Sequence, residues 1–531
     1  MTLQADERHG AREAAPLILS GLAWLWFLGS VALLYLPAAL LPAFDYHHAW
    51  VTAHFTTIAS TFAEVGIIDL GGVPIQNNLP LTTLPDVYAN WPPVYGYALS
   101  FVIRLFGDGE GVVHAFACSV VLLSALLILL IIRRSFGTLA GLCGAALFLN
   151  MPIIATYGHM ASQLNLCVAL LLLALLLMLQ ATDPARQSRA VWSALGSALA
   201  LALAVGSSWE AVLATPVLFG LALLRRSRAD LRLSFGLGVT GTLTVLAVLA
   251  LYFWSYPEYF EAVVERVRMR AGFGAEYEAA ANPLFESPHF LQERAEAATT
   301  ASWAQSMFTA LRRFADLGPV GVIAILFFAV ARLPGVLPPA QIDKAVFAIL
   351  GAYFIWGLAM PHHMVIHDYQ TLLVAPAPAL AFGLLIGRLP VSAHWDKGVL
   401  TALLLAVVAT SVLARVQDTR ALLSRQSVSP EITFLQAVAE VVPEDAIVMH
   451  PSRSMVPVYY ADAHVIRYVA DDATLETVQE NVQALCPECP VFLAIPASAS
   501  AQFPRGLARL PVAYEDRTGV LLSVPGPAAA E

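Results

Sequence analysis

Apolar residues occur in long blocks separated by short polar stretches. The four clearest blocks span 16–41, 112–132, 164–180 and 233–254. Blocks of about 17 to 25 residues, when helical, cross a bilayer core of roughly 30 Å. Shorter blocks, long enough once their flanking residues are added, span 139–154, 190–206, 212–224, 320–331, 346–360, 372–386 and 400–413. The pattern predicts an α-helical polytopic membrane protein with about eleven transmembrane helices.

The pattern changes near residue 417. Apolar runs shrink to strand length at 446–449, 464–469, 491–495 and 519–524, and helical stretches at 430–442 and 473–485 lie between them. Strands that alternate with helices predict a small α/β domain. No glycine-rich loop follows a strand, so we do not expect this domain to bind a nucleotide.

These patterns divide the chain into three parts. Residues 1–15 form a cytoplasmic tail, 16–416 a transmembrane domain, and 417–531 an extracytoplasmic C-terminal α/β domain. The transmembrane domain has two long extracytoplasmic loops, at 45–111 and 255–317. Helical spacing of apolar residues predicts short helices over 49–65 and 92–106 in the first loop.

Composition supports this reading and excludes one class of partner. The 531 residues are 58% hydrophobic and 13% charged, whereas an ordinary soluble domain carries about 25% charged residues. The formal net charge of −9 argues against nucleic acid, which requires a basic surface.

The lysine and arginine side chains predict the orientation. If the N-terminus is cytoplasmic, the short loops that carry most of these cations all fall on the cytoplasmic side, which is the positive-inside pattern. The cations concerned are Lys344, Lys397, Arg133, Arg134, Arg186, Arg189, Arg225, Arg226, Arg228, Arg332 and Arg388. Most histidines lie on the opposite side. We therefore expect a multi-pass protein of a bacterial plasma (inner) membrane, with its chemistry at the extracytoplasmic face.

Asp45 follows the first span directly, in the sequence Phe-Asp-Tyr-His-His. A carboxylate at the membrane edge is costly unless it is solvated, paired or used. Solvation at a helix end is one interpretation of Asp45. The other is a general base that faces a cavity above the membrane.

Two further polar segments lie at the same predicted level. Residues 90–97 read Asn-Trp-Pro-Pro-Val-Tyr-Gly-Tyr, where two prolines start a helix and aromatic residues lie at the interface. Residues 361–370 read Pro-His-His-Met-Val-Ile-His-Asp-Tyr-Gln and enter a late span. The second segment is either a wetted interfacial loop or a site that recognises phosphate or sugar hydroxyls.

The order of these parts resembles the GT-C glycosyltransferases, which include the protein O-mannosyltransferases and the aminoarabinose transferases of lipid A. The resemblance rests on an acid after the first span, Trp91-Pro92-Pro93-Val94-Tyr95 before the second, and His367-Asp368-Tyr369-Gln370 followed by Pro376 and Pro378. It covers residues 16–415 as a layout.

The resemblance implies a transferase that takes a sugar from a polyprenyl-phosphate donor and passes it to a lipid, glycan or protein acceptor. Asp45 matches the family's catalytic acid, and an inverting transfer would make it the general base. Arginines suit the leaving phosphate because the guanidinium fork matches phosphate oxygens. The residues expected to contact substrate are His47, His48, Trp91, Tyr95, His159, Gln163, Arg266, Arg268, Arg270, His363, His367 and Tyr369, with Arg104 as another candidate for the phosphate.

Three positions depart from the family pattern. Many relatives have Asp-Glu where this chain has Asp45-Tyr46, and many carry an acid in the second outer loop, where this chain has 157–163. Either His159 or Gln163 takes over the role of that acid, or the chain is an inactive or unusual member of the family. At the join 206–216, many relatives carry Lys-Gly-Pro, whereas this chain has Ser-Ser-Trp-Glu at 207–210.

No cofactor is certain from the sequence. A divalent metal would require Asp45, His47, His48 and His362 to converge. Cys486 and Cys489 form a lone CxxC, for which we expect a disulfide in an oxidising compartment rather than zinc, which requires further ligands. Cys118, Cys143 and Cys167 lie in apolar blocks and are expected to pack there.

Two other functions stay open at this stage. A transporter or flippase of lipid-linked saccharides would place ionisable residues near the middle of its spans, and Glu210 is the residue that fits this pattern best. A non-catalytic accessory protein of an envelope complex is the other.

Overall fold

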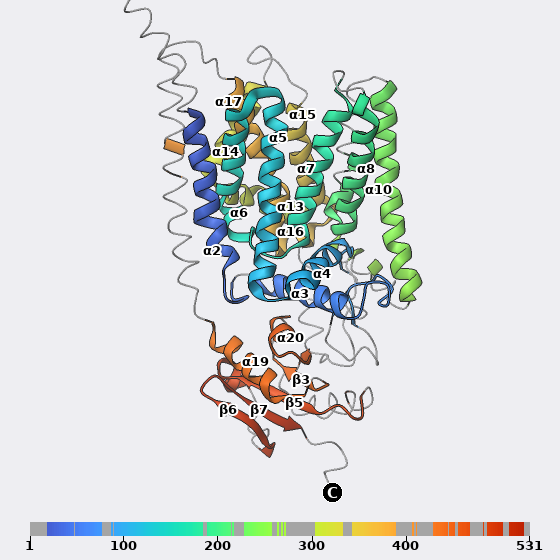
Figure 1. The fold of residues 1–531 in the computed structure, drawn as a ribbon, viewed down its shortest axis with the longest axis vertical. Coiled ribbons are helices and arrows are strands. Elements are labelled where there is room, and N and C mark those ends of the chain that lie inside the picture. The colour runs from blue at the N-terminus through green and yellow to red at the C-terminus, as the bar shows by residue number, and fades with distance from the viewer. Residues whose placement is uncertain are drawn as a thin grey trace, which may run out of the picture.

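The computed structural model describes most of the membrane region and of the C-terminal domain. The described residues are 19–46, 48–76, 86–88, 90–183, 188–213, 215–216, 228–257, 263–264, 267–268, 270–271, 303–332, 342–388, 406–407, 410, 428–443, 445–451, 455–467, 482, 486–502 and 509–524. Figure 1 shows a bundle of helices standing side by side, with a small sheet domain at one end.

Seven of the described helices are long and apolar enough to cross a membrane. They are Leu19–Ala39, Glu110–Asn150, Gln163–Ala181, Ala190–Ser207, Leu231–Ser255, Trp303–Ala331 and Asp368–Arg388. The first contains a π-helical turn, Val31–Tyr35, and ends in α2 (Leu36–Ala39). The second to fifth correspond to α5 (Glu110–Asn150), α7 (Gln163–Ala181), α8 (Ala190–Ser207) and α10 (Arg228–Ser255). The predicted class, a polytopic helical membrane protein, is confirmed.

Helix α5 contains two of the predicted spans. It breaks at Gly137, whose φ of 84° is accessible to glycine without strain. A Cβ on Gly141 would lie 2.7 Å from the backbone oxygen of Leu129, and one on Gly144 would lie 2.5 Å from Ile132 Cδ1. The second half of α5 therefore packs directly against the first as a hairpin, since small residues allow close backbone approach in membranes.

The chain after Leu19–Ala39 forms the end of the bundle that faces the sheet domain. Helices α3 (Ala49–Glu64) and α4 (Val94–Phe106) pack against each other, close to the predicted ranges. Between them, β1 (Ile75–Gln76) pairs with β2 (Asp86–Val87). Arg104 on α4 donates to the carbonyl oxygens of Phe62 and Ala63 at the end of α3. Arg104 therefore stabilises a helix C-terminus.

The late helices begin earlier than the apolar pattern suggests. Helix α13 (Trp303–Arg312) continues through the 3-10 turn Arg313–Leu317 into α14 (Gly318–Ala331), so helix starts within the range predicted as loop. Then follow α15 (Asp343–Ala359), the short α16 (Pro361–Ile366), the 3-10 turn Asp368–Leu373 and α17 (Pro376–Arg388).

In its described residues, the C-terminal domain is a five-stranded mixed sheet with two helices. The strand order is β4-β3-β5-β7-β6, comprising β3 (Ile447–His450), β4 (His464–Arg467), β5 (Val491–Pro496), β6 (Val512–Asp516) and β7 (Gly519–Val524). Strand β3 is parallel to β4 and β5, whereas β7 is antiparallel to β5 and β6. A 3-10 turn, Ala497–Gln502, follows β5. The predicted helix 473–485 lies outside the described residues except for Val482.

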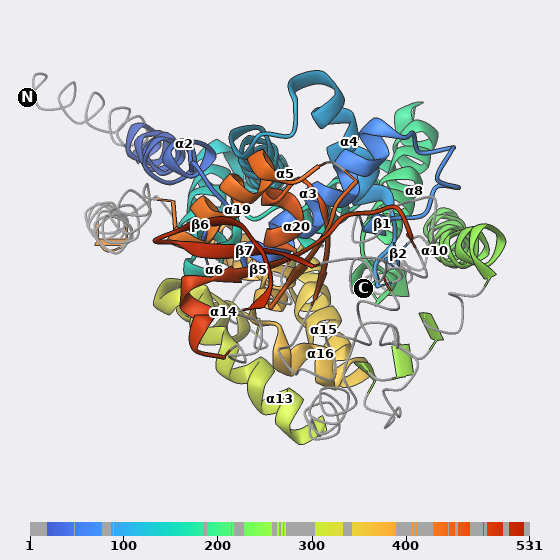
Figure 2. The ribbon, with the colours of Figure 1, turned by 90° about the horizontal axis from the view of Figure 1, so that it is seen from below.

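Two helices of this domain face the membrane region. Helix α19 (Pro430–Val441) starts at Ser429, whose side chain caps Ile432 N, and the short α20 (Val456–Tyr460) packs against α3. Seen from below, α20 lies over α3 at the centre of the molecule (Figure 2). The C-terminal domain therefore covers the same end of the bundle at which the first span ends.

Candidate functional site

Asp45 lies exposed at the end of the first span, between the membrane region and the C-terminal domain. The preceding residue, Phe44, is buried, and its backbone N–H donates to the hydroxyl of Tyr460 on α20 at 2.8 Å. The carboxylate of Asp45 also raises the pKa of Glu431, at the start of α19, where burial is the larger cause. Asp45 is thus a solvent-accessible carboxylate with the C-terminal domain beside it.

His48 joins the first loop to the late histidine segment. Its Nδ1 accepts from Trp50 Nε1 at 3.1 Å, so its Nε2 carries the proton and donates to Asp368 Oδ1 at 2.8 Å. The hydroxyl of Tyr157 donates to the other oxygen of Asp368 at 2.6 Å. His48 has a φ of 63°, a left-handed conformation that the surrounding contacts must hold.

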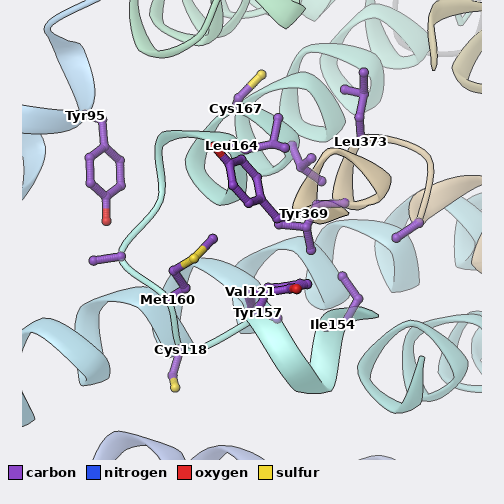
Figure 3. Close-up of a cluster of buried hydrophobic side chains, with 14 of the residues drawn as sticks. Tyr95, Cys118, Val121, Ile154, Tyr157, Met160, Leu164, Cys167, Tyr369 and Leu373 are labelled. Atoms are coloured by element: carbon purple, nitrogen blue, oxygen red, sulfur yellow. The ribbon is translucent and has the colours of Figure 1, made fainter. Parts of the chain in front are cut away.

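Aromatic rings also pack around the hydrogen-bonded group of His48, Asp368 and Tyr157. The rings of His48 and Tyr369 lie 5.4 Å apart, and those of Tyr157 and Tyr369 lie 6.3 Å apart. Figure 3 shows Tyr157 and Tyr369 in a buried cluster with Met160 and Leu164. The first loop, the second outer loop at α6 (Pro152–Tyr157) and the late segment therefore meet at one place.

Arg270, Trp91 and His363 form a second group. The guanidinium carbon of Arg270 lies 4.8 Å from the centre of the Trp91 ring, a cation–π distance. The Trp91 ring lies 5.3 Å from that of His363, which in turn lies 4.5 Å from His367. Tyr252 on α10 donates to the carbonyl oxygen of Trp91 at 2.8 Å and fixes this segment.

Glu210 lies buried behind His363. Its side chain accepts a hydrogen bond from Ser208, and its Oε1 lies 3.9 Å from His363 Nε2. Gln370 donates its amide to the same Nε2 at 2.8 Å, so the neutral ring of His363 carries its proton on Nδ1. A fully buried carboxylate requires such hydrogen bonds. This acid lies at the join where the sequence departs from the family pattern.

Arg313 shapes the loop that carries the histidines. It is buried, and its guanidinium donates to the backbone oxygens of Met364, Val365 and His367. Two carbonyl groups at the end of α16 and one in the link to the following 3-10 turn are satisfied in this way. The position of His367 therefore depends on a side chain from a different span.

Burial keeps the late histidines neutral. It lowers the pKa of His363 and His367 well below the ordinary value, and the charge of Arg270 lowers both further. The pKa of His362 is also lowered by burial and by Arg270. A cation beside neutral imidazoles forms a region of positive potential that favours an anion.

The other predicted residues lie elsewhere or outside the description. Tyr95 is buried against Phe55, and Gln163 is buried at the start of α7, where its Oε1 accepts from Ser162. His159 is buried 4.6 Å from the Tyr46 ring. Arg268 is exposed. His47 and Arg266 lie outside the described residues.

The described side chains do not form a metal site. No three His, Cys, Asp or Glu side chains among the described residues are placed to hold an ion. His48 pairs with Asp368, and His47 is not described, so we derive no step through a metal. In the C-terminal domain Cys486 and Cys489 form a disulfide, and Cys118, Cys143 and Cys167 are buried, as predicted.

Several residues of this region were not among the predicted contacts. Asp368 accepts hydrogen bonds from both His48 and Tyr157, and Arg313 positions His367. Arg313 gave no clear signal in the sequence, because Arg312 and Asp316 lie beside it in a range predicted as loop. Tyr157 gave no sequence signal either, because its partner is 211 residues away.

Comparisons with known proteins agree with this arrangement. The profile of the dolichyl-phosphate-mannose-protein mannosyltransferase family matches residues 90–254, just under a third of the chain. The structure matches that of ArnT from Cupriavidus metallidurans bound to undecaprenyl phosphate, with a TM-score of 0.63, 14% identity, and 95% of this chain and 98% of the other covered. The chain therefore has the fold of ArnT, and its residues 90–254 resemble the mannosyltransferase family.

A more distant match has the same fold. The oligosaccharyltransferase AglB from Archaeoglobus fulgidus, in complex with an inhibitory peptide and a dolichol-phosphate, matches with a TM-score of 0.52 at 13% identity, covering 89% of this chain and 69% of the other. A search of curated proteins finds no match. The matched family segment, 90–254, contains Trp91 and Glu210 and excludes Asp45 and His367.

Proposed function

We propose that the protein transfers a sugar from a polyprenyl-phosphate donor to a hydroxyl group of a lipid, glycan or protein at the extracytoplasmic face of a bacterial plasma membrane. Asp45 is the general base. The observation that carries this proposal is the placement of Asp45: a solvent-accessible carboxylate ends the first span at the face where the cationic, histidine-rich group also lies.

The reaction that fits this arrangement is an inverting displacement. The carboxylate of Asp45 accepts the proton of the acceptor hydroxyl while that oxygen attacks the anomeric carbon of the sugar. The bond between the anomeric carbon and the phosphate oxygen breaks, and the polyprenyl phosphate leaves with the electron pair. General-base catalysis of this kind contributes about 100-fold to 10,000-fold to a rate.

Arg270 is the residue best placed to stabilise the leaving phosphate. Its guanidinium stacks on Trp91, whose ring lies beside His363, and its charge helps burial to lower the pKa of His363 and His367, which are neutral. A charge-assisted bidentate contact to phosphate is among the stronger hydrogen-bonding arrangements. The neutral histidines can donate hydrogen bonds to the same oxygens without adding charge before the lipid binds.

The relatives support the donor class. ArnT was crystallised bound to undecaprenyl phosphate, and the AglB structure is a complex with an inhibitory peptide and a dolichol-phosphate. We infer a polyprenyl-phosphate donor for this chain from the common fold and from the Arg270 group. The sugar and the acceptor are for the experiment to identify.

Transfer of radiolabelled sugar from a panel of polyprenyl-phosphate donors tests the proposal. Full-length wild type, Asp45→Asn and Asp69→Asn are purified and reconstituted in nanodiscs. Asp69 is the matched control, because it is an exposed acid of the same loop and Asp69→Asn makes the same charge change. We expect wild type and Asp69→Asn to release lipid phosphate, and Asp45→Asn to be slower by about 100-fold or more.

Two outcomes contradict the proposal. Equal rates for Asp45→Asn and wild type would exclude Asp45 as the base. No release from any donor, with lipid binding intact in all three proteins, would exclude the transferase and favour a carrier of lipid-linked saccharides.

A further inference from the structure

The C-terminal domain reaches the candidate base through two adjacent tyrosines. Tyr459 and Tyr460 end the short helix α20, and both rings contact Phe44, at centroid distances of 4.7 and 6.1 Å. Phe44 is 1% exposed, so this contact is a packed part of the interface. The two hydroxyl groups, however, bind different partners.

Tyr460 binds the backbone next to Asp45. Its hydroxyl oxygen accepts the N–H of Phe44 at 2.8 Å, and its own proton is directed to the carboxylate of Glu110 at the start of α5. This chain of hydrogen bonds joins α20, the turn after the first span, and α5. A buried backbone N–H paired with a hydroxyl that is itself held in place is a rigid attachment.

Tyr459 binds elsewhere. Its hydroxyl donates to the backbone oxygen of Asp108 at 2.8 Å, in the turn between α4 and α5. This hydrogen bond also ties the domain to the membrane region, but it does not involve the segment that carries Asp45.

We propose that Tyr460 is a positioning residue for Asp45, so that the C-terminal domain is a working part of the transferase site. By accepting the Phe44 N–H, Tyr460 fixes the backbone from which the Asp45 carboxylate projects. An exposed carboxylate at a turn would otherwise sample many positions, and a displacement of about 1 Å can reduce a rate about 100-fold. This inference rests on the proposed function and names the role of the domain in it.

Glu431 provides a second link between the domain and Asp45. It lies in the first turn of α19, partly buried, and burial followed by the charge of Asp45 raises its pKa. Two helices of the domain therefore lie near this turn, α20 through a hydrogen bond and α19 through the charge of Glu431.

The test compares Tyr460→Phe with Tyr459→Phe in the full-length protein, using the donor that wild type turns over. Each variant loses one hydroxyl and keeps its ring packing. Tyr459→Phe loses the hydrogen bond to Asp108, whereas Tyr460→Phe loses those to Phe44 and Glu110. We expect Tyr460→Phe to lower kcat at least tenfold with the KM for the donor unchanged within about twofold. Tyr459→Phe is expected to keep kcat within about twofold of wild type.

Hydrogen–deuterium exchange of the peptide that contains Phe44 is measured on the same samples, and should be faster in Tyr460→Phe only. Glu110→Gln is a further variant. It leaves both tyrosines in place and removes the charge that orients the Tyr460 hydroxyl. We expect it to lower kcat about threefold.

The outcomes separate this inference from the proposed function. An equal loss of kcat in both tyrosine variants would mean that only the attachment of the C-terminal domain matters. An unchanged kcat in Tyr460→Phe would mean that Tyr460 does not position Asp45. Either result would overturn the inference and leave the transferase intact. Absence of turnover in wild type would reject the transferase and this inference with it.

Discussion

At the residue scale, the same residue types serve different purposes according to their partners. Both ring nitrogens of His48 are engaged, by Trp50 and Asp368, so His48 connects two loops. His363 and His367 are buried and neutral beside Arg270, which makes them suitable as hydrogen-bond donors to an anion. From the sequence all three are equivalent candidates for substrate contact. Only their contacts show that His48 has a structural role and that His363 and His367 are candidate ligands.

Glu431 predicts a pH-dependent stability of the C-terminal domain. Burial and the Asp45 charge raise its pKa above the ordinary 4.5, so the folded state binds this proton more tightly than the unfolded state. Stability should therefore fall as the pH rises from about 4.5 through the raised pKa, and stay level above it. We expect Glu431→Gln to stabilise the domain at pH 7.5 by less than about 1 kcal/mol.

Thermal unfolding in detergent from pH 4 to pH 8 measures this effect. Glu440→Gln is the control, because Glu440 is an exposed acid on the same helix. A gap between Glu431→Gln and wild type that stays constant over the whole pH range would show that the proton of Glu431 is not responsible.

At the element scale, glycines decide how α5 folds back on itself. Gly137 breaks the helix, and Gly141 and Gly144 bring its second half against the first. The hairpin places α6 and the following loop, and therefore Tyr157, at the end of the bundle where His48 and Asp368 meet. The geometry of the site thus depends on close packing far from it.

Gly141→Val should disrupt this hairpin. A Cβ at this position meets a backbone oxygen at 2.7 Å, and backbone cannot move aside as a side chain can. We expect a loss of about 1–3 kcal/mol, typical of overpacking, measured by thermal unfolding of the purified protein. Gly351→Ala on α15, which has open space around its Cβ, should change stability by less than about 1 kcal/mol. Equal stability of the two variants would argue against the close contact.

At the scale of the whole molecule, the two ends of the bundle differ in their chemistry. At one end Asp343 pairs with Arg332 and Arg388, with nitrogen–oxygen distances of 2.6 Å. At the other lie Asp45, the Arg270 group and the C-terminal domain. Clustered arginines at one end are typical of a cytoplasmic face, and this agrees with the proposal that the chemistry lies on the extracytoplasmic side.

Cysteine labelling tests this orientation. The described free cysteines are buried, so a new exposed cysteine should dominate the signal. A membrane-impermeant maleimide added to intact cells should label Glu515→Cys, in the C-terminal domain. It should label Arg189→Cys, at the opposite end, only after the membrane is opened. The reverse result would invert the proposed topology.

The hydrophobic pattern alone determined the membrane class, the short helices of the first loop, and four of the five strands. Lipid makes this possible, because a span must be apolar along its whole length and its backbone must bond internally. Strand β6 was not predicted, since its residues are mostly exposed at a sheet edge and show no apolar alternation. Helix α20 was not predicted because it is only five residues long.

Only the tertiary structure decided which polar residues meet. Asp368 lies 320 residues from His48, and Tyr460 lies 416 residues from Phe44. Neither pairing leaves a local pattern, because a hydrogen bond between distant segments constrains one side chain at each end and nothing between them. The sequence could therefore predict Asp45 as the candidate base. The fold was needed to show that a tyrosine of the C-terminal domain binds the backbone beside it.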